Sequence, residues 1–87
     1  MHAVVVRVTI NDVESSERVL REQTVPGVSQ VPGFVAGYWT RKDNTGLSMV
    51  LFDSEDAANA ASERVPSFVP DAVTLEGVEV REVVANA

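Results

Sequence analysis

Two arginines stand out because each lies beside strongly apolar residues. Arg7 interrupts the run HAVVVRVTI, and Arg41 follows Trp39 by two residues, so that Arg41 and Trp39 share one face of an extended strand. A guanidinium group there can bind an anionic group of a substrate or an acidic group of a partner subunit. The alternative is a structural ion pair with one of the 13 acidic residues, such as Glu79 or Glu82. Because an unpaired guanidinium is costly in apolar surroundings, we expect Arg7 to have a partner of one kind or the other.

Tyr38 and Trp39 are the aromatic candidates for contact with a substrate. Neighbouring residues of a regular strand point to opposite faces, so these two cannot line the same pocket unless a bulge intervenes. The alternative role for Trp39 is that of a packing anchor in a core or an interface. Arg7, Tyr38, Trp39 and Arg41 form the predicted substrate-binding set, and no residue is assigned as catalytic.

The composition limits the other chemistry that the chain could perform. There is no cysteine and only one histidine, His2, which excludes thiolate nucleophiles and multi-histidine metal sites. His2 itself is expected to be a solvated residue near the chain end. Glu55 and Asp56 fit the start of a helix, where the helix dipole favours acids, so we expect no metal site there. No phosphate-binding loop or dinucleotide fingerprint is present, and no cofactor is expected. A Ser-His-Asp set is also absent.

The charge balance excludes two classes of partner. Seven basic and 13 acidic residues give a net charge of −6, without the basic footprint that nucleic-acid binding requires. An anionic membrane surface would repel such a chain. No apolar run approaches the roughly 18 residues of a membrane-spanning helix, and the first residues lack a charged signal-peptide region. We therefore expect a cytoplasmic protein.

The patterning predicts six elements in the order β-α-β-β-α-β. Strands are expected where β-branched or aromatic residues run without interruption, and helices where apolar residues recur three or four positions apart. The predicted strands cover residues 2–10, 34–42, 47–53 and 74–84, and the predicted helices cover residues 13–25 and 55–65. Asn11 or Asp12 is expected to cap the first helix, and Ser54 the second. Pro26 should kink or stop the first helix, with a further turn over 28–31, and Pro66 should stop the second.

This order predicts one α+β domain, residues 1–87, with the ferredoxin-like topology. Both helices should cover one face of a four-stranded antiparallel sheet. The side chains expected to meet the helices are Val4, Val6, Val8 and Ile10. The opposite face should also be apolar, because Leu47, Met49 and Leu51 alternate with Ser48, Val50 and Phe52. A bare face of this kind would be a large apolar patch, so we expect a homodimer that buries it.

Two segments carry a resemblance to a known family. The run Pro32-Gly33-Phe34-Val35-Ala36-Gly37-Tyr38-Trp39 and the junction Phe52-Asp53-Ser54-Glu55-Asp56-Ala57 resemble the dimeric α/β-barrel superfamily, and within it the antibiotic biosynthesis monooxygenase-like domains. The resemblance implies two sheets packed face to face, with a cavity between the sheet and the helices of each subunit. Family enzymes oxidise electron-rich aromatic substrates with O2 and no bound cofactor, around an Asn, a Trp and a Tyr. Asn11, Trp39 and Tyr38 are the corresponding residue types here.

Two functional hypotheses follow. The first is a small homodimer that binds an apolar or aromatic small molecule and acts as a cofactor-independent monooxygenase. The second is a non-catalytic dimerisation or ligand-binding module whose aromatic residues serve packing. Haem degradation, found in another branch of the superfamily, is not expected, because residues 54–65 contain no histidine ligand. A cavity filled by Trp39 and Phe52 would favour the module, whereas polar groups aimed into a cavity would favour the enzyme.

Overall fold

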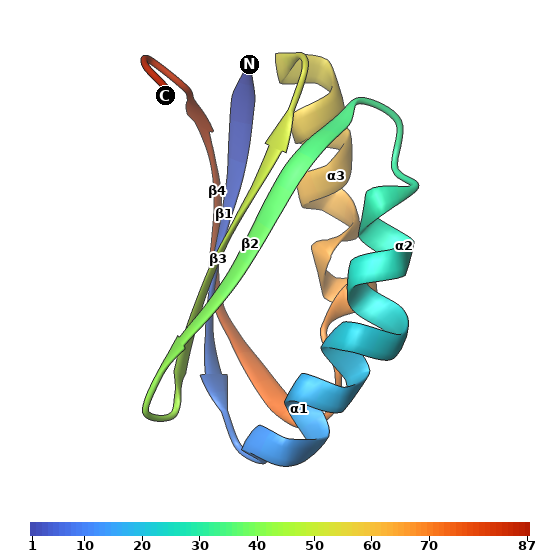
Figure 1. Cartoon of the computed structure of the whole chain (residues 1–87), viewed down its shortest axis with the longest axis vertical. Helices are drawn as coiled ribbons and strands as arrows, with labels where there is room; N and C mark the ends of the chain where they lie inside the picture. Colours follow the sequence, from blue (N-terminus) through green and yellow to red (C-terminus); the bar gives the residue numbers. More distant parts are fainter.

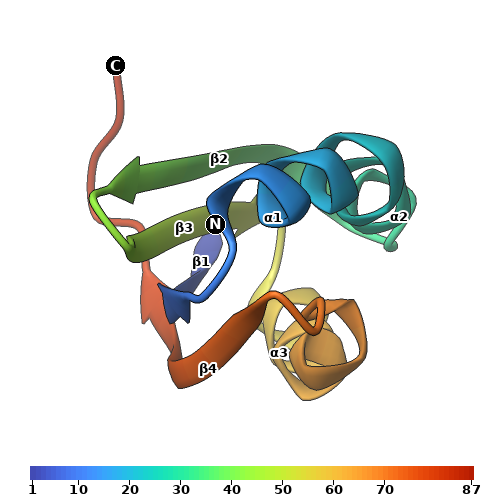
Figure 2. The same cartoon turned by 90° about the horizontal axis from the view of Figure 1, so that it is seen from below.

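The four strands form a single antiparallel sheet in the order β2-β3-β1-β4, with every helix on one face (Figure 1). The structure is a computed structural model that describes residues 1–87. Its elements are β1 (His2–Ile10), α1 (Val13–Val19), a π-helical segment (Leu20–Thr24), α2 (Val25–Ser29), β2 (Phe34–Lys42), β3 (Thr45–Phe52), α3 (Glu55–Phe68) and β4 (Val73–Glu82). This α+β arrangement is compatible with the predicted ferredoxin-like fold. The helices form two arms: the first consists of α1, the π-helical segment and α2, and the second is α3. Seen from below, the two arms lie side by side over the sheet (Figure 2).

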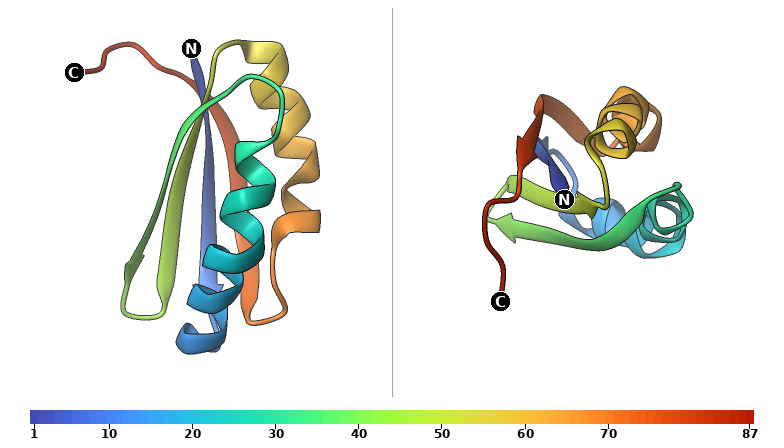
Figure 3. Two further views of the ribbon diagram at one scale, coloured as in Figure 1. Left: turned by 45° about the vertical axis from the view of Figure 1, so that its right-hand side comes forward. Right: turned by 90° about the horizontal axis from the view of Figure 1, so that it is seen from above.

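The first helical arm covers the predicted range 13–25 and continues through Pro26 to Ser29, where only a separate turn over 28–31 was expected. Asp12 caps it, since the backbone N–H of Ser15 donates to Asp12 Oδ1 at 3.1 Å. The arm then continues through the π-helical segment into α2 and ends at Ser29, without a break in the helical ribbon (Figure 3). Pro26 lies in the first turn of α2, immediately after the wider π turn. Because a π turn shifts the hydrogen bonds to carbonyls five residues back, the chain accommodates a proline that has no N–H to donate.

The second helix also extends past its proline. The prediction that Pro66 stops the helix is wrong, because α3 continues to Phe68 with Pro66 inside it. Pro66 stands in the last turn, so few backbone hydrogen bonds remain to be disrupted beyond it. The predicted start is confirmed: Ser54 has extended backbone geometry, and its Oγ accepts a hydrogen bond from the N–H of Ala57 at 3.1 Å.

Replacing Ser54 by Ala should lower the free energy of unfolding by about 0.5–2 kcal/mol, because the N–H of Ala57 loses its acceptor. Urea denaturation followed by circular dichroism measures this change. Ser67→Ala is the control, since Ser67 is an exposed serine at the opposite end of α3. An unfolding curve of Ser54→Ala that overlays the curve of the native chain would show that the cap contributes nothing.

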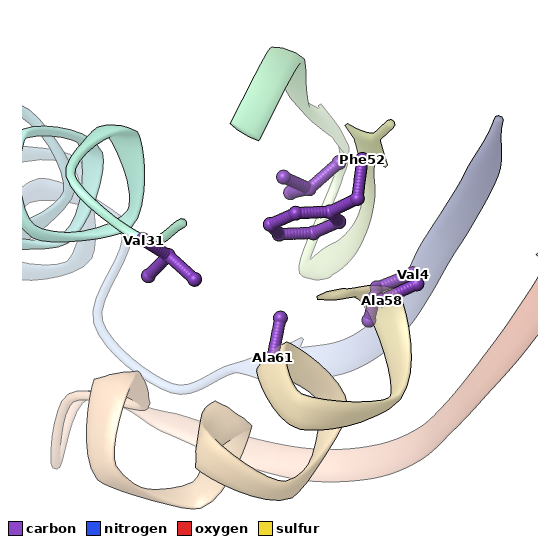
Figure 4. Close-up of a cluster of buried hydrophobic side chains, with 6 residues drawn as sticks. Val4, Val31, Phe52, Ala58 and Ala61 are labelled. Atoms are coloured by element: carbon purple, nitrogen blue, oxygen red, sulfur yellow. The ribbon is translucent and has the colours of Figure 1, made fainter. Parts of the chain in front are cut away.

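The hydrophobic core lies between the sheet and the helices, as predicted. Its buried members are Val4, Val31, Val50, Phe52, Ala58 and Ala61. Figure 4 shows the Phe52 ring with side chains from β1 and α3 around it. Ala58 is 0% exposed, and its small size lets α3 lie close to the sheet. The predicted helix-facing side of β1 is confirmed, since Val4 and Ile10 are buried and Val6 packs against the core.

The hairpin between β2 and β3 fixes which side chains share a face. The strands are joined by Asp43 and Asn44, with Asp43 in the left-handed region at φ 54°. The register sets Tyr38 opposite Met49 and Trp39 opposite Ser48. The irregularity of β2 lies between Phe34 and Ala36, before the aromatic pair. Tyr38 and Trp39 therefore keep the regular alternation and lie on opposite faces of the sheet.

Candidate functional site

A pocket of about 430 Å³ opens between the sheet and the two helical arms, the first arm and α3. Of its 25 lining residues, 17 are hydrophobic. The sheet contributes the inner sides of β1, β2 and β3, including Val6, the first helical arm contributes Leu20, and α3 contributes Val65. Phe52 and Trp39 belong to the lining but leave the pocket unfilled. A space of this size with apolar walls suits the body of a small organic molecule.

Trp39 lies flat along the helix-facing side of the sheet. A Cβ atom built on Gly37 would be 2.7 Å from Cη2 of the Trp39 indole, so the ring covers the glycine directly. Any larger residue at position 37 would displace the ring. Gly37 therefore sets the orientation of Trp39 in the pocket wall.

The polar side chains of the pocket gather where the helical arm faces the hairpin end of β2. Nε of Arg41 lies 3.2 Å from Oε1 of Glu17, an ion pair that joins β2 to α1. Arg41 Nη1 also donates to the backbone carbonyl of Asp43 at 3.1 Å. Arg21 lines the same pocket and forms no ion pair. Since Arg21 and Arg41 are both exposed, they stand at the edge of the pocket and not in its depth.

The four predicted substrate-binding residues are divided between the two faces of the sheet. Trp39 and Arg41 line the pocket. Tyr38, which is 63% exposed, and Arg7 lie on the outer face. Asn11, the residue compared with the family asparagine, does not line the pocket, and its side chain donates to Thr74 Oγ1 at 3.1 Å. The structure thus brings Trp39 and Arg41 together and leaves the other three residues elsewhere.

Arg7 has no acidic partner within the chain. Glu79, one of the acids proposed for it, pairs with Arg81 at 2.9 Å instead. The Arg7 guanidinium lies over Gly77, where a Cβ would come within 2.5 Å of Nη2. The expected internal partner is absent because Arg7 is exposed to solvent, so its charge needs no protein counter-charge in the single chain.

Replacing Arg7 by Met should change the free energy of unfolding of the single chain by no more than about 0.5 kcal/mol, because no buried acid loses a partner. Ligand binding in the pocket should also be unchanged. Urea denaturation at low protein concentration measures the first quantity, and titration with a pocket ligand the second. A loss of a few kcal/mol would reveal a structural ion pair that contradicts this description.

His2 differs from its prediction as a solvated residue. Its side chain is 18% exposed, and Nε2 lies 3.3 Å from Oε2 of Glu55 at the start of α3. His2 is the first residue of β1 and already pairs with both β3 and β4, so it belongs to the sheet. Its Nδ1 atom is buried without a hydrogen-bond partner.

No group of three or more acidic or histidine side chains is placed to hold a metal ion.

Sequence analysis missed Glu17 and Arg21 as members of the site. A signal was present, because Ser16, Leu20 and Thr24 recur four positions apart as one stripe of the first helix, and all three line the pocket. Glu17 and Arg21 each follow a stripe residue by one position and lie four residues apart, so they border the same side of the helix.

None of the helices is both long enough and apolar enough to cross a membrane.

The chain was compared with protein-family models and with curated proteins. No family model matches it, and no curated protein matches it in sequence. The resemblance to the dimeric α/β-barrel superfamily therefore rests on the two sequence segments alone, Pro32–Trp39 and Phe52–Ala57. Functional conclusions must come from the pocket and from the two faces of the sheet.

Proposed function

We propose that this domain binds an apolar or aromatic small molecule in the pocket between its sheet and its two helical arms. The observation that carries the proposal is a pocket of about 430 Å³ that remains open although Trp39 and Phe52 both border it. An apolar ligand in this space would gain contacts with the apolar side chains that line it. The proposed function requires no cofactor. We also propose a cytoplasmic location, which rests on the sequence alone.

The second part of the proposal is a homodimer formed through the outer face of the sheet. Three large apolar side chains on this face are well exposed: Tyr38 (63%), Leu47 (49%) and Met49 (44%). They are neighbours across β2 and β3, since Tyr38 pairs with Met49 and Leu47 lies two residues from Met49. A second copy of the same face would bury this patch, as in the dimeric α/β barrels that the sequence resembles.

Trp39 in the pocket wall favours oxygenase activity as a second candidate function. The reaction would convert an anthrone and O2 into an anthraquinone and water, with the deprotonated substrate as the electron donor. Of the Asn, Trp and Tyr that the family resemblance implies, only Trp39 lines the pocket, because Tyr38 and Asn11 lie outside it. A non-catalytic binding module uses the same pocket without this chemistry. Oxygen uptake with anthrone, compared between the native chain and Trp39→Phe, separates the two functions.

Trp39 offers a direct test of binding because it is the only tryptophan. Its fluorescence should change in a saturable way when apolar aromatic compounds such as anthrone and 4-hexylbenzyl alcohol are titrated, and calorimetry should give the same affinity. Ser48 lines the pocket, so Ser48→Phe should fill the space and abolish binding while the chain stays folded. Asn59→Phe is the matched control, since it places the same ring on the exposed side of α3. Failure of all compounds to bind would overturn the proposal.

A further inference from the structure

The charges at the edge of the pocket are unevenly distributed. Among the ionisable side chains that line it are two arginines, Arg21 and Arg41, and one acid, Glu17. Glu17 is already engaged with Arg41, at 3.2 Å from its Nε, and Arg21 has no ionic partner. The apolar pocket therefore ends in a region with one uncompensated positive charge.

This local excess contrasts with the rest of the molecule. The whole chain carries a net charge of −6. At physiological ionic strength, charges more than about 8 Å away are largely screened, so a ligand at the pocket edge responds mainly to the nearest groups. The local arginines therefore outweigh the acidic remainder of the protein for a group held in contact with them.

We propose that the natural ligand is an amphipathic monoanion, with an apolar or aromatic body in the pocket and a carboxylate or similar anionic group against Arg21 and Arg41. This inference rests on the proposed binding function and specifies its ligand class. Arg41 is held in place from both sides, by Glu17 and by the carbonyl of Asp43. Arg21 is a second donor on the facing helical arm, so an anion between β2 and the arm receives hydrogen bonds from two directions.

A matched series of ligands tests the charge of the head group. The compounds are 4-hexylbenzoate, 4-hexylbenzyl alcohol and 4-hexylbenzylamine, which share one body and carry an anionic, a neutral and a cationic head. Affinities come from calorimetry and from Trp39 fluorescence. The carboxylate should bind about tenfold or more tightly than the alcohol, and the amine most weakly. Raising the salt concentration should weaken binding of the carboxylate and leave that of the alcohol nearly unchanged.

Four variants assign the preference to the named side chains. Arg21→Gln and Arg41→Gln should each weaken binding of the carboxylate much more than binding of the alcohol. Glu17→Gln keeps an oxygen that can accept from Arg41 but removes the negative charge, so binding of the carboxylate should strengthen. Arg18→Gln is the charge-matched control, because Arg18 is exposed on the same helix and does not line the pocket.

The outcomes separate this inference from the proposed function. Tighter binding of the carboxylate that is reduced in both Arg21→Gln and Arg41→Gln, and retained in Arg18→Gln, supports the inference. Equal or tighter binding of the alcohol overturns it while the binding function stands. An equal effect of Arg18→Gln and Arg41→Gln also overturns it, since the preference would then reflect overall charge. If none of the three compounds binds, both the inference and the proposed function fail.

Discussion

Replacing Met49 by Glu is expected to convert the proposed dimer into monomers. Met49 lies on the outer face of the sheet between Tyr38 of β2 and Val5 of β1, and it is 44% exposed in the single chain. A carboxylate there would lose its hydration and face the carboxylate of the second copy when two sheets meet, at a cost of several kcal/mol. In a symmetric dimer the substitution occurs twice. The dissociation constant should therefore rise by at least about a hundredfold.

Sedimentation of the native and substituted chains at micromolar concentration measures this change. The matched control is Val84→Glu, which introduces the same charge at a residue that is 87% exposed and beyond the end of β4. Sedimentation of the native chain solely as a 9.4 kDa species would contradict the dimer, as would a Met49→Glu chain that remains dimeric.

Replacing Phe52 by Ala is expected to remove most of the stability of the domain. Phe52 is 1% exposed and is the largest fully buried side chain. Its ring meets Phe34 edge to face, with 6.4 Å between the ring centroids. Loss of a buried phenylalanine costs about 3–5 kcal/mol, against a total of about 5–15 kcal/mol for a folded domain. The substituted chain should be partly unfolded near physiological temperature.

Urea denaturation at 25 °C, followed by circular dichroism, gives the change in free energy of unfolding. Val84→Ala serves as the surface control and should stay within about 0.5 kcal/mol of the native chain. A loss below about 1 kcal/mol for Phe52→Ala would mean that the core is not organised around this ring.

Features that depend on local sequence were predictable. The alternation of Val4, Val6, Val8 and Ile10 identifies the face of β1 that meets the helices, because successive side chains of a strand point to opposite faces. The cap formed by Ser54 follows from the need of a helix start for a hydrogen-bond acceptor. The same alternation separates Tyr38 from Trp39 across the sheet.

Features that depend on contacts between distant segments were not predictable. Arg41 pairs with Glu17, 24 positions away, and helical spacing places Glu17 beside the pocket without showing that Arg41 is its partner. The π-helical segment before Pro26 likewise compensates for a proline whose local effect is to end a helix. Arg7 has no acidic partner because the single chain leaves it exposed, which depends on the packing of the whole sheet.

Two resonances on opposite faces of the sheet test most directly where a ligand binds. Trp39 supplies the only indole N–H, and it lines the pocket, whereas the Met49 methyl group lies on the outer face. In a nuclear magnetic resonance titration with 4-hexylbenzoate, the account predicts a saturable shift of the Trp39 indole resonance and little change at the Met49 methyl. A shift of the Met49 methyl with an unchanged Trp39 indole would contradict it, because the ligand would then occupy the sheet face and not the pocket.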